Sequence, residues 1–310
     1  MPQTDAKIDV TQFPIVDAHQ HFWDLKHNYL PWLCDEPPIP FRYGDYAAIR
    51  KDYLPDDYRH DSAKYRIVKT VYMEAEWDRR DPAAETRWVE KINAATGLPT
   101  ACIGHAEPDR ADIADVLTAH AQSALIRGIR HKPKSAPSPR EATRGAPGSM
   151  DDPRWRAGYA LLERFGFSYD LQTPWWHLDA AAELAADFPH TQIIINHTGL
   201  PSDRTDEGLR AWRLALESVS RQPNIAIKIS GIGRPNLPWT VEANGPVIRD
   251  AISIFGVDRC MFASNFPVDS LIGSFDTIYD GFFASVSDRS IDDHRKLFPT
   301  MRSAFTGFRR

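Results

Sequence analysis

Eight short runs rich in β-branched and other apolar residues recur along the chain, and stretches with helical periodicity separate most of them. The stretch after the second run is clearly delimited, because Asp81-Pro82 suits a first helical turn and Gly97 suits a helix end. Strands that alternate with helices in this way pair in parallel through right-handed crossovers. The predicted strands cover residues 15–18, 67–73, 100–104, 125–129, 167–171, 192–196, 224–229 and 259–263, and later predicted helices cover 153–165, 178–188, 207–222 and 246–255.

The eight units predict a (β/α)8 TIM barrel of the α/β class, forming a single domain over residues 1–310. An open doubly wound sheet is the alternative, but the first run lacks the G-x-G-x-x-G turn that binds a dinucleotide. Three connections that follow predicted strands are longer than ordinary loops: residues 22–60, 132–153 and 231–246. In a barrel we expect them on the C-terminal face, where they build and cover an active site or else decorate the surface.

The net charge and the cysteine content limit which binding partners and which cellular compartment are expected for the protein. The chain has 37 Lys and Arg against 42 Asp and Glu, a formal charge of −5, which argues against nucleic acid or an anionic membrane as a partner. Cys34, Cys102 and Cys260 show no paired spacing, and no apolar run approaches the roughly 20 residues that span a bilayer. We therefore expect a cytoplasmic protein, monomeric or homodimeric, that acts on a small molecule.

The sequence Asp17-Ala-His19-Gln-His21 directly follows the first apolar run. Side chains two apart in a strand share a face, so both imidazoles are expected to point into the barrel at its C-terminal end. Two imidazoles on one face form half of a metal site, and the alternative is a pair of histidines that hydrogen-bond a substrate. Polar residues at the ends of the other predicted strands place one active site there: Glu74, Glu76, His105, Arg130, His131, Asp170, Gln172, His197, Lys228 and Asn265.

Five motifs, in their order along the chain, resemble the amidohydrolase superfamily. They are Asp-Ala-His-Gln-His-Phe-Trp at 17–23, Arg-Gly-Ile-Arg at 127–130, Asn-His-Thr-Gly-Leu-Pro at 196–201, Lys-Ile-Ser-Gly at 228–231 and Phe-Ala-Ser-Asn-Phe-Pro-Val-Asp at 262–269. The resemblance is to the branch of TIM-barrel hydrolases that includes the L-fuconolactonase, L-rhamnonolactonase, sulfomuconolactone and pyrone-dicarboxylate lactonase types. It covers nearly the whole chain and is specific for the family, not for one substrate.

The resemblance implies roles for individual residues. His19, His21 and His197 would bind a metal ion or substrate, and Glu74 would be a further metal ligand. Arg130 would contact a substrate carboxylate or hydroxyl. Further contacts to substrate are expected from Trp23, His131 and Gln172.

Asn265 departs from the family pattern, which usually places an aspartate there as ligand and general base. A neutral amide cannot accept a proton near pH 7, so Asn265 is expected to orient water or substrate. Asp269 is the first candidate for a replacement base. His177, His197 or a metal-bound hydroxide are the alternatives.

The leading hypothesis is hydrolysis of a cyclic ester, from a sugar acid or a related carboxylated lactone. A divalent ion, with zinc as the default and manganese less favoured, would activate water and polarise the carbonyl. Without a metal, His19, His21, Arg130 and His197 would polarise the carbonyl directly. A lyase of the same superfamily, either a decarboxylase or a hydratase, is the second hypothesis. A catalytically inactive binding protein, suggested by Asn265, is the third.

Overall fold

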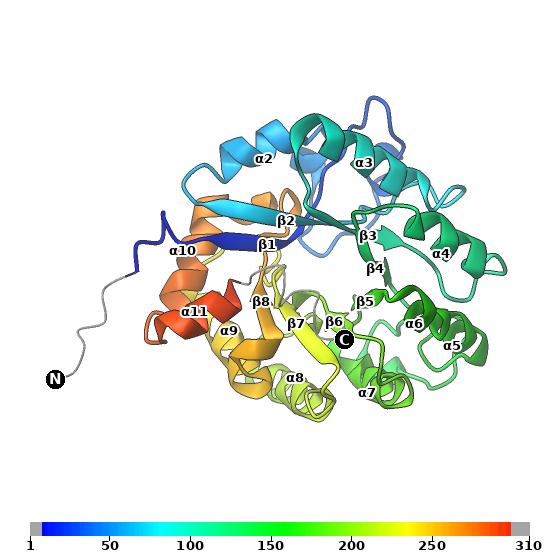
Figure 1. The fold of residues 1–310 in the computed structure, drawn as a ribbon. Coiled ribbons are helices and arrows are strands. Elements are labelled where there is room, and N and C mark those ends of the chain that lie inside the picture. Colours follow the sequence, from blue (N-terminus) through cyan, green and yellow to red (C-terminus); the bar gives the residue numbers. More distant parts are fainter. Residues whose placement is uncertain (1–7, 299–310) are drawn as a thin grey trace.

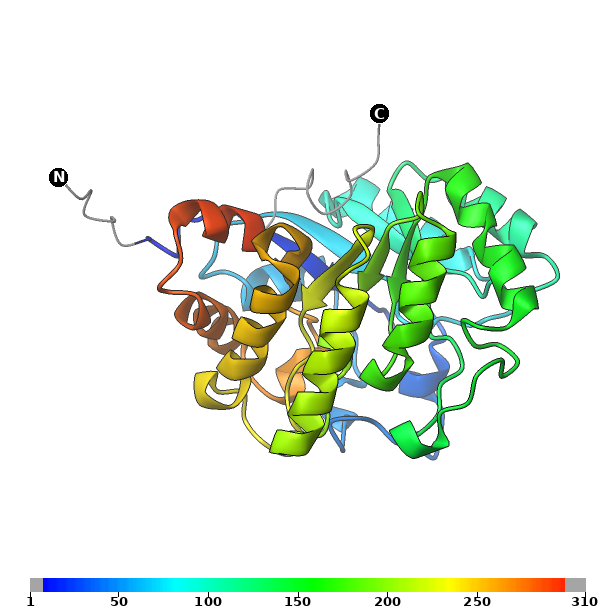
Figure 2. The ribbon, with the colours of Figure 1, turned by 90° about the horizontal axis from the view of Figure 1, so that it is seen from below.

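The computed structural model describes residues 8–298 and has eight parallel strands in one sheet, ordered β1 to β8 as in the chain (Figure 1). The predicted TIM barrel is confirmed, because each strand pairs with the next along the chain and helices surround the strands (Figure 2). The strands are β1 (Ile15–Gln20), β2 (Ile67–Met73), β3 (Ala101–His105), β4 (Ile126–His131), β5 (Ser168–Leu171), β6 (Ile193–Ile195), β7 (Ile225–Ile229) and β8 (Cys260–Phe262).

The helices lie mainly between the strands, as the alternating pattern predicts. None of the helices in the described residues is long and apolar enough to cross a membrane. They are α1 (Pro31–Cys34), α2 (Pro55–Asp61), α3 (Ala84–Thr96), α4 (Ile113–Ala121), α5 (Pro153–Tyr159), α6 (Leu161–Phe165), α7 (Leu178–Asp187), α8 (Asp206–Val219), α9 (Val241–Phe255), α10 (Phe275–Ser285) and α11 (Ile291–Leu297).

Two predicted helices differ from those observed. The helix predicted over 246–255 starts earlier, because Thr240 caps α9 by accepting a hydrogen bond from the Ala243 backbone N–H, and Pro246 lies inside the helix. The third long connection therefore ends near residue 240. The helix predicted over 153–165 is divided into α5 and α6 at Ala160.

The core has an outer and an inner part. The largest apolar cluster contains strand and helix residues, so it packs the strands against the surrounding helices. Two smaller clusters contain residues of the strands and their immediate ends, as expected for the filled interior of a barrel. Their members are Ala18, Ile194, Ala226, Met261 and Ala263 in one, and Val71, Met73, Ala101 and Ile103 in the other.

The first strand and the segment after the last strand meet along a seam that closes the barrel. The Asp17 carboxylate accepts hydrogen bonds from the Ser264 backbone N–H at 2.8 Å and from the Ser264 hydroxyl at 2.6 Å. The Asn265 backbone N–H donates to the His19 carbonyl oxygen at 2.8 Å. The seam therefore places two candidate site residues, His19 and Asn265, side by side.

Candidate active site

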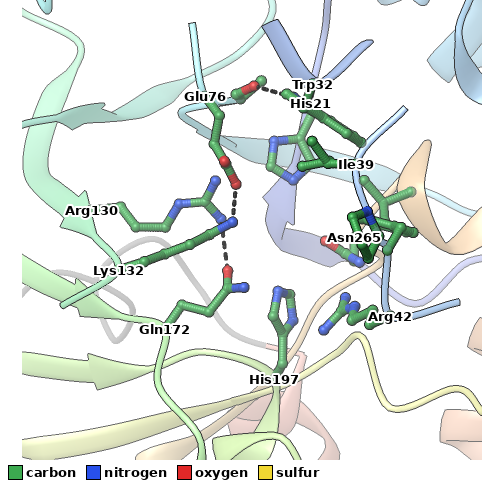
Figure 3. Close-up of a pocket in the computed structure, with 14 residues that line it drawn as sticks. His21, Trp32, Ile39, Arg42, Glu76, Arg130, Lys132, Gln172, His197 and Asn265 are labelled. Atoms are coloured by element: carbon green, nitrogen blue, oxygen red, sulfur yellow. Dashed lines mark hydrogen bonds and ion pairs between the residues drawn. The ribbon is translucent and has the colours of Figure 1, made fainter. Parts of the chain in front are cut away.

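A cavity of about 230 Å³ opens where the carboxyl ends of the strands meet the first long connection (Figure 3). Residues from this connection form one wall, as expected for a loop on the C-terminal face of a barrel. The opposite side comes from residues that end or follow the strands. The lining includes Trp32, Ile39, Phe41 and Arg42 from the connection, and His21, Glu76, Arg130, Lys132, Gln172, His197 and Asn265 from the strand ends.

Three buried histidines lie together, and two of them, His21 and His197, line the cavity. The Nε2 atoms of His19 and His21 are 3.2 Å apart, and the ring centroids of His19 and His197 are 4.8 Å apart. Nδ1 of His21 lies 2.9 Å from the Met73 carbonyl oxygen. Because a carbonyl only accepts, Nδ1 of His21 carries a proton, and its Nε2 faces His19 and Asn265. The sequence prediction that the two β1 imidazoles meet is thus reproduced in the fold.

These histidines are neutral at physiological pH. Burial, reinforced by the charge of Arg130, lowers the pKa of His21 to about 3. Burial also holds the pKa values of His19 and His197 well below the usual range, and Arg42 adds to the effect at His197. The site is therefore a group of uncharged imidazoles surrounded by fixed positive charge.

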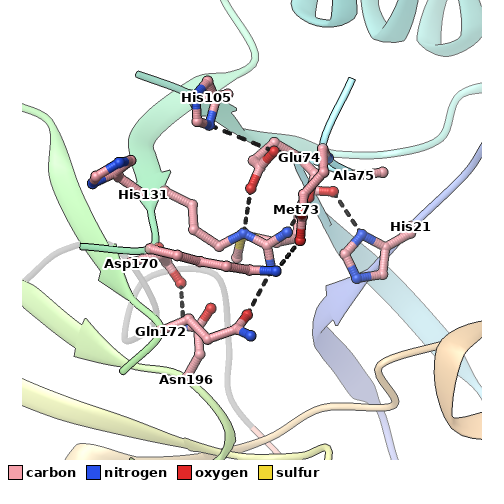
Figure 4. A network of polar contacts seen from close by, with 12 residues as sticks. His21, Met73, Glu74, Ala75, His105, His131, Asp170, Gln172 and Asn196 are labelled. Carbon is pink, nitrogen blue, oxygen red and sulfur yellow. Dashed lines mark hydrogen bonds and ion pairs between the residues drawn. The ribbon is translucent and has the colours of Figure 1, made fainter. Parts of the chain in front are cut away.

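Glu74 and Arg130 form a buried ion pair, and Figure 4 shows Glu74 within a network of polar contacts. Nε of Arg130 donates to Oε1 of Glu74 at 2.6 Å, and the guanidinium also donates to the Glu74 backbone carbonyl. Oε2 of Glu74 accepts from the Glu76 backbone N–H at 2.9 Å. Burial opposes ionisation of Glu74, but the charges of Arg130 and Arg79 outweigh it and hold its pKa well below the usual range. Glu74 is thus an anion whose oxygens are already engaged.

A second buried ion pair lies in the barrel. Nζ of Lys228 is 2.5 Å from Oδ1 of Asp170, and the Asn196 amide donates to the same oxygen at 2.9 Å. Both charged side chains are at most 1% exposed. The pair orders the ends of β5 and β7 next to the site.

Asn265 lines the cavity, and Asp269 lies behind it. The Asn265 amide donates to Oδ1 of Asp269 at 2.6 Å, and the Tyr43 hydroxyl donates to the same oxygen at 3.0 Å. Oδ2 of Asp269 accepts from the Gly231 backbone N–H at 3.2 Å. Burial raises the pKa of Asp269 to about 6, although nearby Arg42 opposes this rise. This geometry makes Asp269 a residue that positions the Asn265 amide, and its predicted role as a base stays a prediction.

Three residues predicted to contact substrate or to act in catalysis do not line this cavity. Nε2 of His177 accepts a hydrogen bond from the Ala136 backbone N–H at 2.9 Å, so it holds the connection 132–153. His131 accepts a hydrogen bond from the Trp155 indole at 3.3 Å. The indole of the buried Trp23 donates to a backbone carbonyl of the first connection. Their predicted roles gain no support from the geometry, whereas Gln172 does line the cavity.

Sequence reasoning missed Arg42, which lies next to His197 and Asn265 (Figure 3). Gly231 makes this approach possible: a Cβ there would lie 2.5 Å from Nδ1 of His197 and 2.6 Å from Nη2 of Arg42. The φ angle of Gly231 is +57°, which also favours glycine. The Lys-Ile-Ser-Gly motif includes this glycine, but only the folded structure shows that its missing side chain leaves room for Arg42 beside His197.

The backbone at the site adopts unusual conformations. Glu76, His197 and Asn265 have φ angles of 60°, 54° and 55°, in the left-handed region that non-glycine residues rarely occupy. Such conformations concentrate at functional sites, where the surrounding structure holds them. They aim these three side chains into one cavity.

The donor set fits a divalent metal ion only in part. His19 and His21 present facing nitrogens, but Glu74 is engaged by Arg130, and Asn265 offers a neutral amide instead of a carboxylate. In the described part of the chain, no group of three or more His, Cys, Asp or Glu side chains is arranged to hold a metal ion. The positive charge of Arg130 also opposes a cation. The residues described in the structure therefore do not form a complete metal site.

An eight-stranded barrel with histidines and an arginine at its carboxyl-end cavity defines the chain as a TIM barrel of the amidohydrolase type. The family model described as Amidohydrolase matches residues 16–298, and the chain belongs to this family. The resemblance inferred from the sequence motifs is thereby confirmed.

Relatives in the family differ in how closely they match. The chain is 39% identical over 296 residues to the protein y4mH of Sinorhizobium fredii, covering 96% of this chain and 99% of the relative. It is 25% identical over 268 residues to an L-fucono-1,5-lactonase of Burkholderia ambifaria, covering 84% of this chain and 82% of that enzyme. The family is thus established, and the lactonases are distant relatives.

Solved structures share the fold at low sequence identity. A zinc-bound amidohydrolase from Burkholderia multivorans has a TM-score of 0.76 at 21% identity, covering 92% of this chain and 96% of that one. A 5-carboxyvanillate decarboxylase from Novosphingobium aromaticivorans, complexed with manganese, has a TM-score of 0.64 at 13% identity, covering 96% and 98%. Related folds therefore carry zinc or manganese in proteins other than this one.

Proposed function

We propose that the protein is a hydrolase that opens the cyclic ester of a lactone, either a sugar-acid lactone or a carboxylated one. The observation that carries the proposal is a group of neutral, buried histidines facing a cavity lined by Arg42, Arg130 and Lys132. The distant similarity to L-fucono-1,5-lactonases supports it.

The cationic side chains suit the charge that develops during ester hydrolysis. Water attack places negative charge on the lactone carbonyl oxygen, and preorganised positive groups stabilise that charge. Arg130 is fixed by Glu74, so its orientation does not depend on substrate. Asn265, held by Asp269, is a fixed amide that orients water or substrate.

We propose that a histidine accepts the proton of the attacking water and then donates it to the ring oxygen as the C–O bond breaks. Nε2 of His21 faces Nε2 of His19 at 3.2 Å, and Nδ1 of His21 is held by a backbone carbonyl. Burial and positive neighbours depress the basicity of these imidazoles. An anionic substrate would offset that positive charge and raise their pKa values, so substrate binding itself would strengthen the base.

A lyase is the second candidate, because decarboxylases share this fold. The two reactions differ in their products: lactone hydrolysis yields a new carboxylic acid and releases a proton, whereas decarboxylation releases carbon dioxide. A proton-release screen over carboxylated lactones, run beside a carbon dioxide assay with aromatic acids, separates them. Absence of both reactions favours the inactive binding protein.

Replacing His19 and His21 together by Ala tests the site. We expect lactone turnover to fall by at least about a hundredfold, since both base and positioning imidazoles are lost. His27→Ala is the matched control, because His27 is 75% exposed. Normal turnover in the double variant would refute the assignment.

Zinc remains a proposal for the cofactor, with a metal-free enzyme as the alternative. Elemental analysis of the purified wild-type protein, followed by chelation and re-addition of zinc or manganese, decides between them. One bound ion per chain that disappears in the double variant would support the metal. Full turnover in metal-free protein would support the alternative.

A further inference from the structure

A second cavity, of about 270 Å³, lies next to the candidate active site, and Arg42 lines both cavities. Three arginines, Arg42, Arg204 and Arg234, contribute to its wall, and we call it the arginine pocket. Apolar and aromatic side chains, including Tyr43 and Trp176, complete the lining. Mostly apolar walls with a few convergent polar groups are typical of sites for small molecules.

The arginines of this pocket have buried donors without acceptors. Arg204 donates from Nη2 to the Ile232 carbonyl at 2.6 Å, but its Nε and Nη1 have no partner in the described part of the chain. The same holds for Nε of Arg234 and Nη1 of Arg42. Buried donors are normally satisfied, and leaving them unpaired is costly. Each unpaired atom therefore indicates an acceptor that the protein itself does not provide.

Among the described residues, only one carboxylate pairs with an arginine of the pocket. The nearest carboxylate to Arg42 belongs to Asp269, with 4.0 Å between Nη2 and Oδ1. Within the described residues neither Arg204 nor Arg234 forms an ion pair, whereas Arg130 pairs with Glu74 at 2.6 Å. Burial and the neighbouring charge of Arg234 lower the pKa of Arg204 to about 10. Two guanidinium groups thus repel each other across a cavity that an anion would neutralise.

We propose that the arginine pocket binds an oxyanion, namely a carboxylate, phosphate or sulfonate group, and that this group is the part of the substrate remote from its reacting carbonyl. Guanidinium groups suit such ligands because they donate paired hydrogen bonds to two oxygens. The assignment to substrate rests on the proposed function and on Arg42, which adjoins both His197 and the pocket. The same oxyanion chemistry could come from a free anion, and the experiment separates the two sources.

Binding of inorganic phosphate and sulfate, measured by calorimetry and thermal unfolding, tests the pocket without any turnover. We expect the Tm of the wild-type protein to rise by about 5 °C at an anion concentration 100 times Kd. Arg204→Gln and Arg234→Gln should each weaken binding about tenfold or more. Arg204→Lys keeps the charge and should bind with intermediate affinity. The control is Arg295→Gln, since Arg295 is a surface residue paired with Asp292.

Each outcome of the binding measurements either supports or overturns the proposal. Equal anion affinity in the wild type and in both pocket variants, with circular dichroism showing that all are folded, would overturn the proposal. Absence of binding by the wild type would also overturn it. Loss of affinity in the pocket variants but not in Arg295→Gln supports it.

Kinetics then distinguish a substrate group from a free anion. If the pocket holds the substrate, phosphate competes with a carboxylated lactone, and Arg204→Gln raises the ratio of KM for the carboxylated to the neutral lactone at least tenfold. Phosphate binding that leaves this KM unchanged would overturn the assignment to substrate. If no lactone is hydrolysed while phosphate binding still depends on Arg204, the proposed function fails and the anion pocket stands.

Discussion

The barrel interior and the arginine pocket differ in whether their charged side chains have partners of opposite charge. In the interior, Glu74 pairs with Arg130 at 2.6 Å and Asp170 pairs with Lys228 at 2.5 Å. In the pocket, Arg204 has no carboxylate partner among the described residues and two of its nitrogens lack any acceptor. Buried charges are costly unless they are paired. We therefore infer that the paired groups stabilise the fold and that the unpaired arginines bind a ligand. Pairing therefore separates the scaffold of the site from its recognition surface.

The largest effect is expected from breaking an interior pair. Asp170→Asn leaves the Lys228 ammonium buried beside a neutral amide, which should lower the free energy of unfolding by about 3–5 kcal/mol. Urea denaturation measures this. The double variant Asp170→Asn with Lys228→Met removes both charges and should cost less than the single variant. A loss below about 1 kcal/mol in Asp170→Asn would show that the pair does not support the scaffold.

Asp269 lies between the two regions and should give a pH-dependent contribution to stability. Burial raises its folded pKa from 3.8 to about 6, so the folded protein holds this proton more tightly than the unfolded chain. The resulting stability is present below about pH 4 and is lost as the pH rises through about 6, by roughly 3 kcal/mol. Asp269→Asn should remove this pH dependence from urea denaturation between pH 4 and 7.

The control for this titration is Asp288→Asn, because Asp288 is exposed. It should leave the pH profile unchanged. A profile for Asp269→Asn that coincides with the wild type would mean that another group titrates in this window.

Gly231 lies next to His197 of the candidate active site and lines the arginine pocket, so a side chain at this position should disturb both cavities. Gly231→Ala places a methyl group 2.5 Å from the His197 ring and 2.6 Å from Arg42 at a positive φ, so we expect a loss of about 1–3 kcal/mol. Lactone turnover and phosphate affinity should fall together. Gly145→Ala is the control, since it shares the positive φ but has no atom within 4 Å of the added Cβ. Retention of both would contradict this prediction, and loss of only one would show that the two cavities respond independently.

The smallest effect is expected in the arginine pocket without anion. Arg234→Gln removes no ion pair, so the free energy of unfolding should change by no more than about 0.5 kcal/mol, and relief of repulsion with Arg204 would raise it. Urea denaturation in phosphate-free buffer tests this. A loss above about 2 kcal/mol would show that Arg234 supports the fold rather than a ligand.

The barrel and part of the site could be predicted because they depend on short-range patterns. Alternating strands and helices fix the order of pairing, and the two-residue period of β1 brings His19 and His21 together. Strand ends in a barrel meet on one face, which is why Arg130, His197 and Asn265 were found in advance.

The remaining features depend on contacts between distant segments. Glu74 was expected to bind a metal, but whether a carboxylate meets a cation or a ligand depends on the neighbouring strand, which supplies Arg130. Arg42, Arg204 and Arg234 lie in connections without periodicity, so no local pattern brings them together. His177 follows the end of β5 by six residues, yet its hydrogen bond to Ala136 directs it to the second connection.

The seam between Asp17 and Ser264 also relates the cavity to protein synthesis. His19 belongs to the first strand and Asn265 follows the last, yet their backbones are hydrogen-bonded at 2.8 Å. A chain leaves the ribosome with its N-terminal part first. His19 and His21 are therefore synthesised before nearly all of the strands that complete the cavity. A nascent chain that stops before β8 therefore lacks the wall that completes the cavity. Formation of the site is thus tied to completion of translation through the last strand.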